Sequence, residues 1–280
     1  TTARLAVNDF IVRNSEPSDC LVESSLRAEI SDNVFSNATM ELGGQPNDLL
    51  LGHNHFDNGI IRFVEFQNIE ISGQTGNRGF MVFLGSTDRV EIFDITGLSL
   101  YMSNDSLDRH LGGINIRDSQ FKILWFLNTN DVRINNCTMS HFNSNTSTNF
   151  DFGSSEVSEQ FGLYETVSVN FHNSYLRLID NSVIDDCEDI VFQNCRFLLQ
   201  FQRNHNNIDL RDCDTISFLN CSMMNQTKPR GGLFRFFNSE RIAINNCIFT
   251  SCSKVDELID GHCRALWFTY NCLYNISQIN

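Results

Sequence analysis

Basic residues and long apolar runs are both scarce in this 280-residue chain. Its 20 lysines and arginines are outnumbered by 34 aspartates and glutamates, so the formal net charge is −14. Nucleic acids and anionic membranes are bound through basic surfaces, and the charge therefore argues against both as general partners. No run reaches the roughly 18 apolar residues of a membrane-spanning helix, so no membrane insertion is expected. The first residues, TTARLAVNDF, lack the features of a signal peptide. Export stays open, because the chain can start after a cleavage site.

Charged residues make up only 19% of the chain, and hydrophobic residues make up 41%. A chain with this balance is neither disordered nor a charged tail, and its length allows a substantial core. Among the hydrophobic residues, 24 Phe and 10 Cys stand out.

The abundant residues fall into a repeat. Four segments share an Asn-Cys pattern: VFQNCRF from Val191, SFLNCSM from Ser217, AINNCIF from Ala243 and FTYNCLY from Phe268. Spacings of 26, 26 and 25 separate the cysteines of these segments, which are Cys195, Cys221, Cys247 and Cys272. A second ladder lies upstream with spacings of 26, 26 and 24, and consists of Cys187, Cys213, Ser239 and Cys263. Weaker copies, including VEFQNIEI and VEIFDITG, extend the pattern toward the N-terminus.

Apolar residues alternate within each repeat, which is the period of β-strands and not of helices. A unit of about 25 residues with three short strands cannot bury its own apolar face, but stacked units bury a continuous one. The sequence therefore predicts an all-β parallel β-helix with roughly 10–11 coils, wound right-handed as parallel crossovers favour. Asn at a corner tolerates the left-handed backbone and can bond to the Asn of the next coil. The neighbouring Cys is expected to be a small buried hydrophobe with a free thiol.

The Asn-Cys coils resemble the right-handed parallel β-helix superfamily of pectate lyases, polygalacturonases and bacteriophage tailspikes. The resemblance covers residues 27–280 and is most regular from Cys187 to Tyr274. It implies one solenoid domain over 27–280 and a glycan-binding groove shaped by loops. Residues 1–26 are expected to be an N-terminal capping segment, in which SDCLVESSLRAEI forms either a short helix or a first irregular coil. The polar segment 141–166 breaks the repeat and is expected to be a loop insertion.

Glycosidic cleavage needs two carboxyl groups about 5 to 10 Å apart. The densest acidic cluster supplies the catalytic candidates, which are Asp185, Asp186, Asp209 and Asp212. The repeat aligns Asp185 with Arg211 and Asp209 with Arg235 on adjacent coils, which also favours cross-coil ion pairs. The motifs of polygalacturonases are not reproduced, since Gly261-His262 is followed by Cys263 and no Arg-x-Lys follows.

Lyase chemistry needs a base and a cation beside the substrate carboxylate, but the chain has only three lysines, Lys122, Lys228 and Lys254. No cofactor is required, although Ca²⁺ at the Asp185–Asp189 cluster is an open alternative. No metal site is predicted, since the cysteines lack zinc-type spacing and His53-x-His55 favours an exposed strand.

Sugar rings stack on exposed aromatic faces. The predicted substrate-binding residues are outward aromatic and basic side chains: Phe237, Phe268, Tyr270, Arg211 and Arg235. The leading interpretation is a polysaccharide-recognising protein that binds a cell-surface glycan and depolymerises it as a lyase or hydrolase, with enzymatic activity left open. The alternative is a structural or assembly solenoid of a virion, filament or cell surface. An extracellular, cell-surface or virion location and a homotrimer follow from the resemblance alone, and unpaired thiols favour folding in a reducing compartment.

Overall fold

The structure is a computed structural model of the chain, and it describes residues 4–6, 9–13, 20–23, 27–37, 39–43, 48–64, 68–77, 79–85, 89–104, 111–178, 182–199, 208–225, 233–250 and 259–274. These residues contain no helix and form a parallel β-solenoid with coils about 21 residues apart. The predicted fold class is confirmed, but the coils are shorter than expected. The chain divides into two compact units, Thr1–Met139 and Ser140–Asn280, and each is described by itself.

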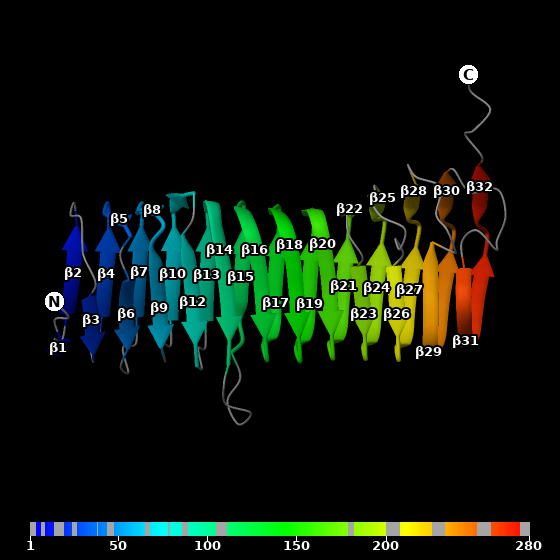
Figure 1. The fold of residues 1–280 in the computed structure, drawn as a ribbon, viewed down its shortest axis with the longest axis horizontal. Coiled ribbons are helices and arrows are strands. Elements are labelled where there is room, and N and C mark those ends of the chain that lie inside the picture. Colours follow the sequence, from blue (N-terminus) through cyan, green and yellow to red (C-terminus); the bar gives the residue numbers. More distant parts are fainter. Residues whose placement is uncertain are drawn as a thin grey trace, which may run out of the picture. The chain divides into compact units, whose positions relative to one another are not determined.

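Unit 1 is built from short strands that run in parallel (Figure 1). They are β1 (Arg4–Ala6), β2 (Asp9–Arg13), β3 (Cys20–Glu23), β4 (Arg27–Ser31), β5 (Val34–Ser36), β6 (Thr39–Gly43), β7 (Asp48–Gly52), β8 (His55–Asp57), β9 (Ile60–Val64), β10 (Asn68–Ser72), β11 (Thr75–Gly76), β12 (Phe80–Leu84), β13 (Arg89–Phe93), β14 (Thr96–Ser103), β15 (Ile114–Arg117), β16 (Gln120–Leu127) and β17 (Asn130–Asn135). Strand β18 (Thr138–Asn145) includes the boundary between the units.

Unit 2 continues with strands of the same kind. They are β19 (Thr148–Gly153), β20 (Glu156–Tyr164), β21 (Val167–His172), β22 (Tyr175–Leu178), β23 (Ser182–Asp185), β24 (Glu188–Gln193), β25 (Arg196–Leu199), β26 (Ile208–Arg211), β27 (Asp214–Leu219), β28 (Ser222–Asn225), β29 (Phe234–Asn245), β30 (Ile248–Thr250), β31 (Ile259–Thr269) and β32 (Cys272–Tyr274).

Three ladders of parallel strands wrap around the core of unit 1. The first consists of β2, β4, β7, β10, β13, β15 and β17, the second of β5, β8, β11 and the start of β14, and the third of β1, β3, β6, β9, β12, β14 and β16. Alternate residues of each strand point inward, so Leu49, Ile69 and Val90 are buried one above another. The outward residues between them form the surfaces on which any site must be built.

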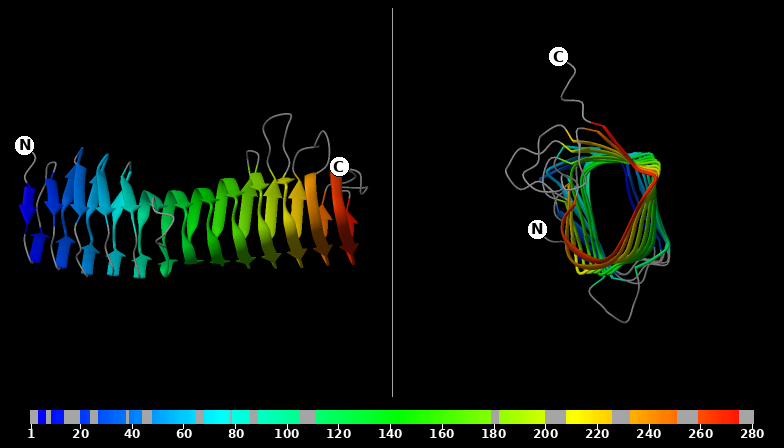
Figure 2. Two further views of the ribbon diagram at one scale, coloured as in Figure 1. Left: turned by 90° about the horizontal axis from the view of Figure 1, so that it is seen from below. Right: turned by 90° about the vertical axis from the view of Figure 1, so that its right-hand side faces the viewer.

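The core of unit 2 is a column of phenylalanines. Phe171, Phe192 and Phe218 come from β21, β24 and β27, and both pairs of neighbouring rings stack with centroids 4.9 Å apart. Phe197, Met223 and Phe249, each two residues after the Cys of an Asn-Cys pair, are buried as well. In the end-on view of Figure 2, the yellow to red coils of this unit follow one another around the core. The regular part of the repeat therefore has the strand phase that the sequence predicts.

Corners in both units are made by residues in the left-handed backbone conformation. Asn194, Asn220 and Asn246 have φ values of 54°, 54° and 53°, as expected for Asn at a sharp bend. The side-chain amide of Asn246 donates to Asn220 at 2.7 Å, and that of Asn194 donates to Asn173 at 3.4 Å. The cysteines that follow the corners are free, and all that the structure describes are buried except Cys263, which is half-buried, and Cys272, which is exposed. The prediction of unpaired thiols is confirmed for the eight cysteines that the structure describes.

The polar segment 141–166 is not a loop insertion. Its residues form most of β18 and all of β19 and β20, and Phe142, Phe152 and Phe161 from these strands are buried. The prediction failed because Ser, Thr and Asn occupy outward and corner positions here and also some buried ones, such as Ser144 and Ser147, which interrupts the apolar pattern that the inward phenylalanines keep. In the N-terminal segment, Cys20–Glu23 forms β3, which pairs with β6. The expected capping helix is therefore wrong over these residues, and the alternative of a first coil fits them.

The last repeat is shifted by one residue relative to its sequence alignment. Ile248 pairs with Cys272, which places Asn271 opposite Cys247 and the corner at Tyr270, whose φ is 56°. Asn271 donates to the carbonyl of Ile244 and accepts from the amide of Cys247. Cys272 therefore leaves the predicted ladder and is exposed. Likewise Leu273 pairs with Phe249, a place that an alignment on the cysteines gives to Tyr274.

Candidate functional site

The structure brings three of the predicted site residues together around Asp209 in unit 2. The carboxylate of Asp209 accepts two hydrogen bonds from Arg235, at 2.9 Å from Nε and 2.7 Å from Nη2. Arg211 donates a third at 2.8 Å from its own strand, β26. The predicted alignment of Asp209 with Arg235 is thus confirmed, and it forms an ion pair. Asp185 is the pairing partner of Arg211, as predicted, although Arg211 bonds to Asp209.

Asp209 occupies an outward position, yet its side chain is only 1% exposed. Burial by itself would raise the pKa of this carboxyl group, but the hydrogen bonds from Arg235 and Arg211 outweigh burial and hold the pKa below its ordinary value. A general acid needs a raised pKa so that it carries a proton at neutral pH. The surroundings of Asp209 therefore fit a structural ion pair better than a proton donor.

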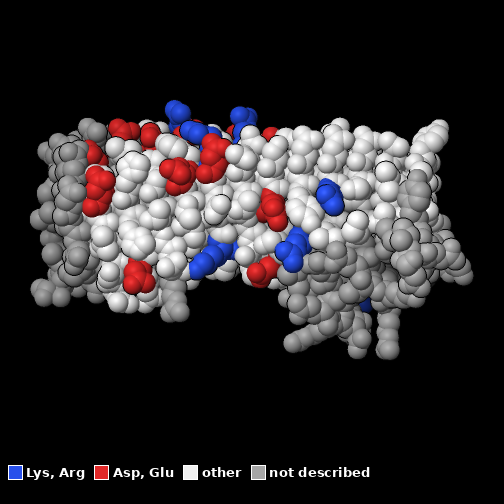
Figure 3. Space-filling view, turned by 90° about the horizontal axis from the view of Figure 1, so that it is seen from above, with Lys and Arg blue, Asp and Glu red and all other residues white. Residues whose placement is uncertain are grey.

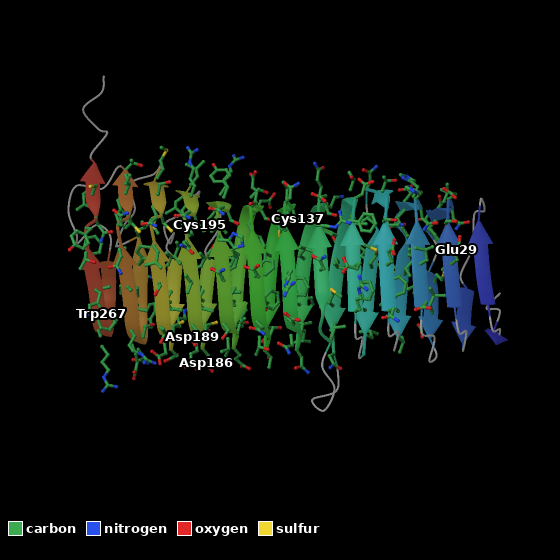
Figure 4. All side chains as sticks on the ribbon, turned by 180° about the vertical axis from the view of Figure 1, so that it is seen from behind. Glu29, Cys137, Asp186, Asp189, Cys195 and Trp267 are labelled. Carbon is green, nitrogen blue, oxygen red and sulfur yellow. The ribbon has the colours of Figure 1, made fainter. Side chains whose placement is uncertain are left out.

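Asp186 and Asp212 are corner residues, with φ values of 50° and 48°. Asp212 accepts a hydrogen bond from the Asn238 amide at 3.1 Å, so it belongs to a corner column in which Asn also occurs. Figure 4 labels Asp186 and Asp189, which lie at one edge of the ribbon, away from Cys195. Asp186 and Asp212 are both exposed. Their backbone conformation accounts for their residue type, and a catalytic role for them stays a prediction.

Two of the three predicted outward aromatics are exposed. Phe237 is 44% exposed and lies beside the guanidinium groups of Arg211 and Arg235, at 5.8 and 5.4 Å from its ring centroid. Tyr270 is 86% exposed at its corner. Phe268 is not outward, because it pairs with the buried Ile244 and stacks on Phe249 with ring centroids 6.0 Å apart. A strand shifted by one residue exchanges its two faces, so Trp267 takes the outward place, 50% exposed.

Among the described residues, a groove lies elsewhere, on the first ladder of unit 1. It has a volume of about 540 Å³, and it is lined by Asp48, Leu49, Leu50, Asn68, Ile69, Glu70, Arg89 and Glu91. These residues come from β7, β10 and β13, so the groove crosses three successive coils. The sequence analysis did not identify any of them as site residues. The segments IEI from Ile69 and VEI from Val90 carried the signal, since aligning them places Glu70 and Glu91 at the same outward position of adjacent coils.

The polar groups of the groove are arranged in two rows. Asp48, Asn68 and Arg89 form one row, in which the Asn68 amide donates to Asp48 at 3.1 Å. In the other row, Glu70 pairs with Glu91. Glu91 accepts hydrogen bonds from Asn115 at 2.8 Å and from Arg89 at 3.5 Å, whereas Glu70 is exposed. The two glutamates therefore differ in their surroundings although they are neighbours.

In the part of the chain that the structure describes, no group of three or more His, Cys, Asp or Glu is placed to hold a metal ion. His55, from the predicted exposed strand, lies 3.0 Å from the hydroxyl of Thr75. On the face shown in Figure 3, acidic and basic side chains alternate, and the coloured residues form no single basic patch.

Within the same described ranges, no helix is long and apolar enough to cross a membrane.

Comparison of the chain with protein-family models, with curated proteins and with solved structures found no match.

Proposed function

We propose that the protein recognises a polysaccharide, which binds in the groove that crosses β7, β10 and β13. The observation that carries the proposal is this groove of about 540 Å³, in which the half-buried outward side chain of Leu50 lies among amide, carboxylate and guanidinium groups. Ligand sites commonly join an apolar floor to a few convergent polar groups. Because successive coils repeat the same outward positions, an extended polymer can meet similar groups along its length.

The charges of the groove favour an uncharged polymer. Asp48, Glu70 and Glu91 outnumber Arg89, and the chain as a whole carries a formal charge of −14. These carboxylates would repel a polyanion. With a neutral sugar there is no such repulsion, because carboxylates accept hydrogen bonds from its hydroxyls and amides both accept and donate them. The ligand class that we propose is therefore a neutral glycan.

Depolymerisation is an extension of the same proposal. Neighbouring parallel strands lie about 4.8 Å apart, so the paired glutamates can approach the separation of about 5 Å that retaining glycoside hydrolases use. Glu91, held by Asn115 and Arg89, suits the carboxylate that acts as nucleophile, and Glu70, its neighbour on the adjacent coil, acts as acid and base once a bound sugar excludes water from it. The resemblance to pectate lyases, polygalacturonases and tailspikes supports glycan chemistry on such a fold but does not select the reaction.

The test is a panel of immobilised neutral and acidic polysaccharides, with reducing ends and unsaturated products measured in solution. We expect the full chain to bind at least one neutral polymer, and Glu70→Gln with Glu91→Gln to weaken that binding. Glu188→Gln, an exposed glutamate of unit 2, is the matched control and should bind like the parent protein. New reducing ends that disappear in Glu91→Gln would establish hydrolysis. Binding to no polymer, or equal binding by the groove variants, would refute the proposal.

A structural or assembly role is the second candidate, and β31 favours it. Leu266 and Trp267 on this strand are 36% and 50% exposed, and Ile248 on β30 is also exposed. Exposed apolar clusters often mark protein contacts. If assembly is the function, sedimentation should reveal concentration-dependent oligomers that Trp267→Ser weakens. A protein that stays monomeric at high concentration would argue against this role.

A further inference from the structure

A row of aromatic side chains lies on the third ladder of unit 1, away from the groove strands. Phe80 on β12, Tyr101 on β14 and Trp125 on β16 come from three successive coils. The ring centroids of Phe80 and Tyr101 are 5.8 Å apart, and those of Tyr101 and Trp125 are 5.4 Å apart. The three side chains thus form one continuous strip that runs from coil to coil.

The strip remains open to solvent. Trp125 is 41% exposed, and Phe80 and Tyr101 are partly exposed. Val82, the pairing partner of Tyr101, adds further apolar surface beside the rings. The core residues Met81, Leu100 and Leu124 fill the inward positions of these strands, so the three rings are additional to the core.

Two basic side chains on the third ladder differ in their partners. Arg62, which pairs with Val82, lies 3.8 Å from the carboxylate of Glu41 on the preceding coil. Lys122 of β16 donates a hydrogen bond to the backbone carbonyl of Asn77. A strip of aromatic side chains with few charges beside it suits the apolar faces of uncharged pyranose rings, which stack on exposed aromatic rings such as Trp125 while their hydroxyls remain hydrated.

We propose that Phe80, Tyr101 and Trp125 form a second carbohydrate-binding surface, which stacks the sugar rings of a neutral polysaccharide. The inference rests on the proposed function, and it adds a separate surface that works by stacking and not by hydrogen bonds from carboxylates. Because the groove lies on the first ladder and the strip on the third, the two surfaces bind separate segments of polymer. Removal of one leaves the contacts of the other in place.

The chain has only 2 Trp residues, which allows a direct test. Trp267→Phe leaves Trp125 as the only tryptophan, and Trp125→Phe leaves Trp267 as the matched control. Each variant is titrated with hydroxyethylcellulose, galactomannan, dextran and polygalacturonate while its fluorescence is recorded. We expect a neutral polymer to shift the Trp125 emission to shorter wavelength and to protect it from acrylamide quenching, with no change for Trp267.

Binding is measured in parallel by affinity electrophoresis in gels that contain the same polymers. Trp125→Ala should weaken binding about tenfold, equivalent to about 1.4 kcal/mol, whereas Trp125→Phe should keep most of it. Circular dichroism identifies any variant that does not fold, and if Trp125→Ala is one of them, Tyr101→Ala, which removes the neighbouring ring of the strip, carries the comparison.

The outcomes separate this inference from the proposed function. A polymer that binds the parent protein, is lost in the groove variants and leaves Trp125 silent would overturn the strip and keep the groove. Failure of every polymer to bind would overturn both. A shift of the Trp125 emission with protein concentration, in the absence of polymer, would show that the strip is a protein contact and would overturn the inference. Tighter binding to polygalacturonate than to the neutral polymers would refute a neutral ligand.

Discussion

Asp209 illustrates how neighbours decide the role of a single residue. Its sequence context is an acidic cluster, but its buried carboxylate is held by Arg235 from the next coil and by Arg211 from its own strand. A buried charge with three hydrogen bonds from cations is satisfied, and removing one partner leaves the others uncompensated. The residues of the acidic cluster therefore have separate roles, and the hydrogen-bond partners of each carboxylate determine its role.

Asp209→Asn is expected to destabilise the fold by about 1–3 kcal/mol at neutral pH, because two guanidinium groups lose a buried anionic partner. The folded pKa of Asp209 lies below the ordinary value of 3.8, so its ion pairs contribute fully above that value. This contribution is lost as the pH falls through the lower, folded pKa. The difference in thermal midpoint between parent and variant should therefore be constant from pH 7 to about pH 5 and shrink below about pH 4.

The matched control is Asp189→Asn, which changes an exposed aspartate of the same unit. It should leave the midpoint nearly unchanged at neutral pH. Equal midpoints for the parent protein and Asp209→Asn at pH 7 would contradict the assignment of Asp209 as a structural ion-pair residue.

The cysteines should differ widely in reactivity, because the thiolate is the reactive form. Burial raises the pKa of Cys187 to about 12 and those of Cys137 and Cys213 to about 11. Cys272 is exposed as a result of the shifted last repeat. Iodoacetamide labelling of the native protein, followed by peptide mass spectrometry, should modify Cys272 first among the eight cysteines that the structure describes.

Labelling in denaturant provides the control, since every cysteine should then react. Native labelling of Cys187 as fast as Cys272 would contradict the buried ladder.

At the scale of elements, the stacked strands of unit 2 are held together by the phenylalanine column. Phe192 contacts the rings of Phe171 and Phe218 along the column, and those of Phe161 and Phe197 beside it. Each of these rings belongs to a different strand. The column therefore couples neighbouring coils, in addition to their backbone hydrogen bonds.

Phe192→Ala should reduce the free energy of unfolding by about 3–5 kcal/mol, since it opens a cavity among four rings. Phe192→Leu, which keeps much of the volume, should cost less. Phe237→Ala removes an exposed ring of the same unit and serves as the control, with a loss of about 1 kcal/mol from its cation–π contacts. Denaturant unfolding provides the measurement, and similar losses for Phe192→Ala and Phe237→Ala would contradict the column.

The elements differ in how well they could be predicted from sequence. The alternation around Phe192 and Phe218 determines the inward face, and Asn194 and Asn220 mark corners through their backbone preference, so these coils were predicted correctly. The segment 141–166 was not, because its polar outward residues hide inward positions such as Phe152. The last repeat misled the alignment, because Asn271 precedes a Cys as other corner residues do but turns its side chain inward.

The site could be predicted less well than the fold. Acidic residues that are dense in sequence, such as Asp185 and Asp186, drew attention, whereas Glu70 and Glu91 are single residues in weak repeats. What joins these two is their shared register on β10 and β13. Coil lengths vary, with separations of 18 and 24 residues between bonded neighbours in unit 1 and 26 in unit 2, so that register could not be counted from the regular repeats.

For the whole molecule, the charge and the repeated coils together define the proposed ligand. A chain with a formal charge of −14 disfavours a polyanion, and a site that crosses successive coils favours an extended chain over a single sugar. If each coil contacts further sugar units, affinity should depend on ligand length. A small pocket for one sugar would show no such dependence.

The most direct measurement is calorimetric titration of the full chain with oligosaccharides of increasing length, prepared from the neutral polymer that binds best. We predict that affinity rises with each added sugar until the groove across β7, β10 and β13 is filled, and then levels off. Glu70→Gln combined with Glu91→Gln should lower that plateau. Equal affinity for the shortest and longest oligosaccharides, or no binding at any length, would contradict recognition of a polysaccharide across successive coils.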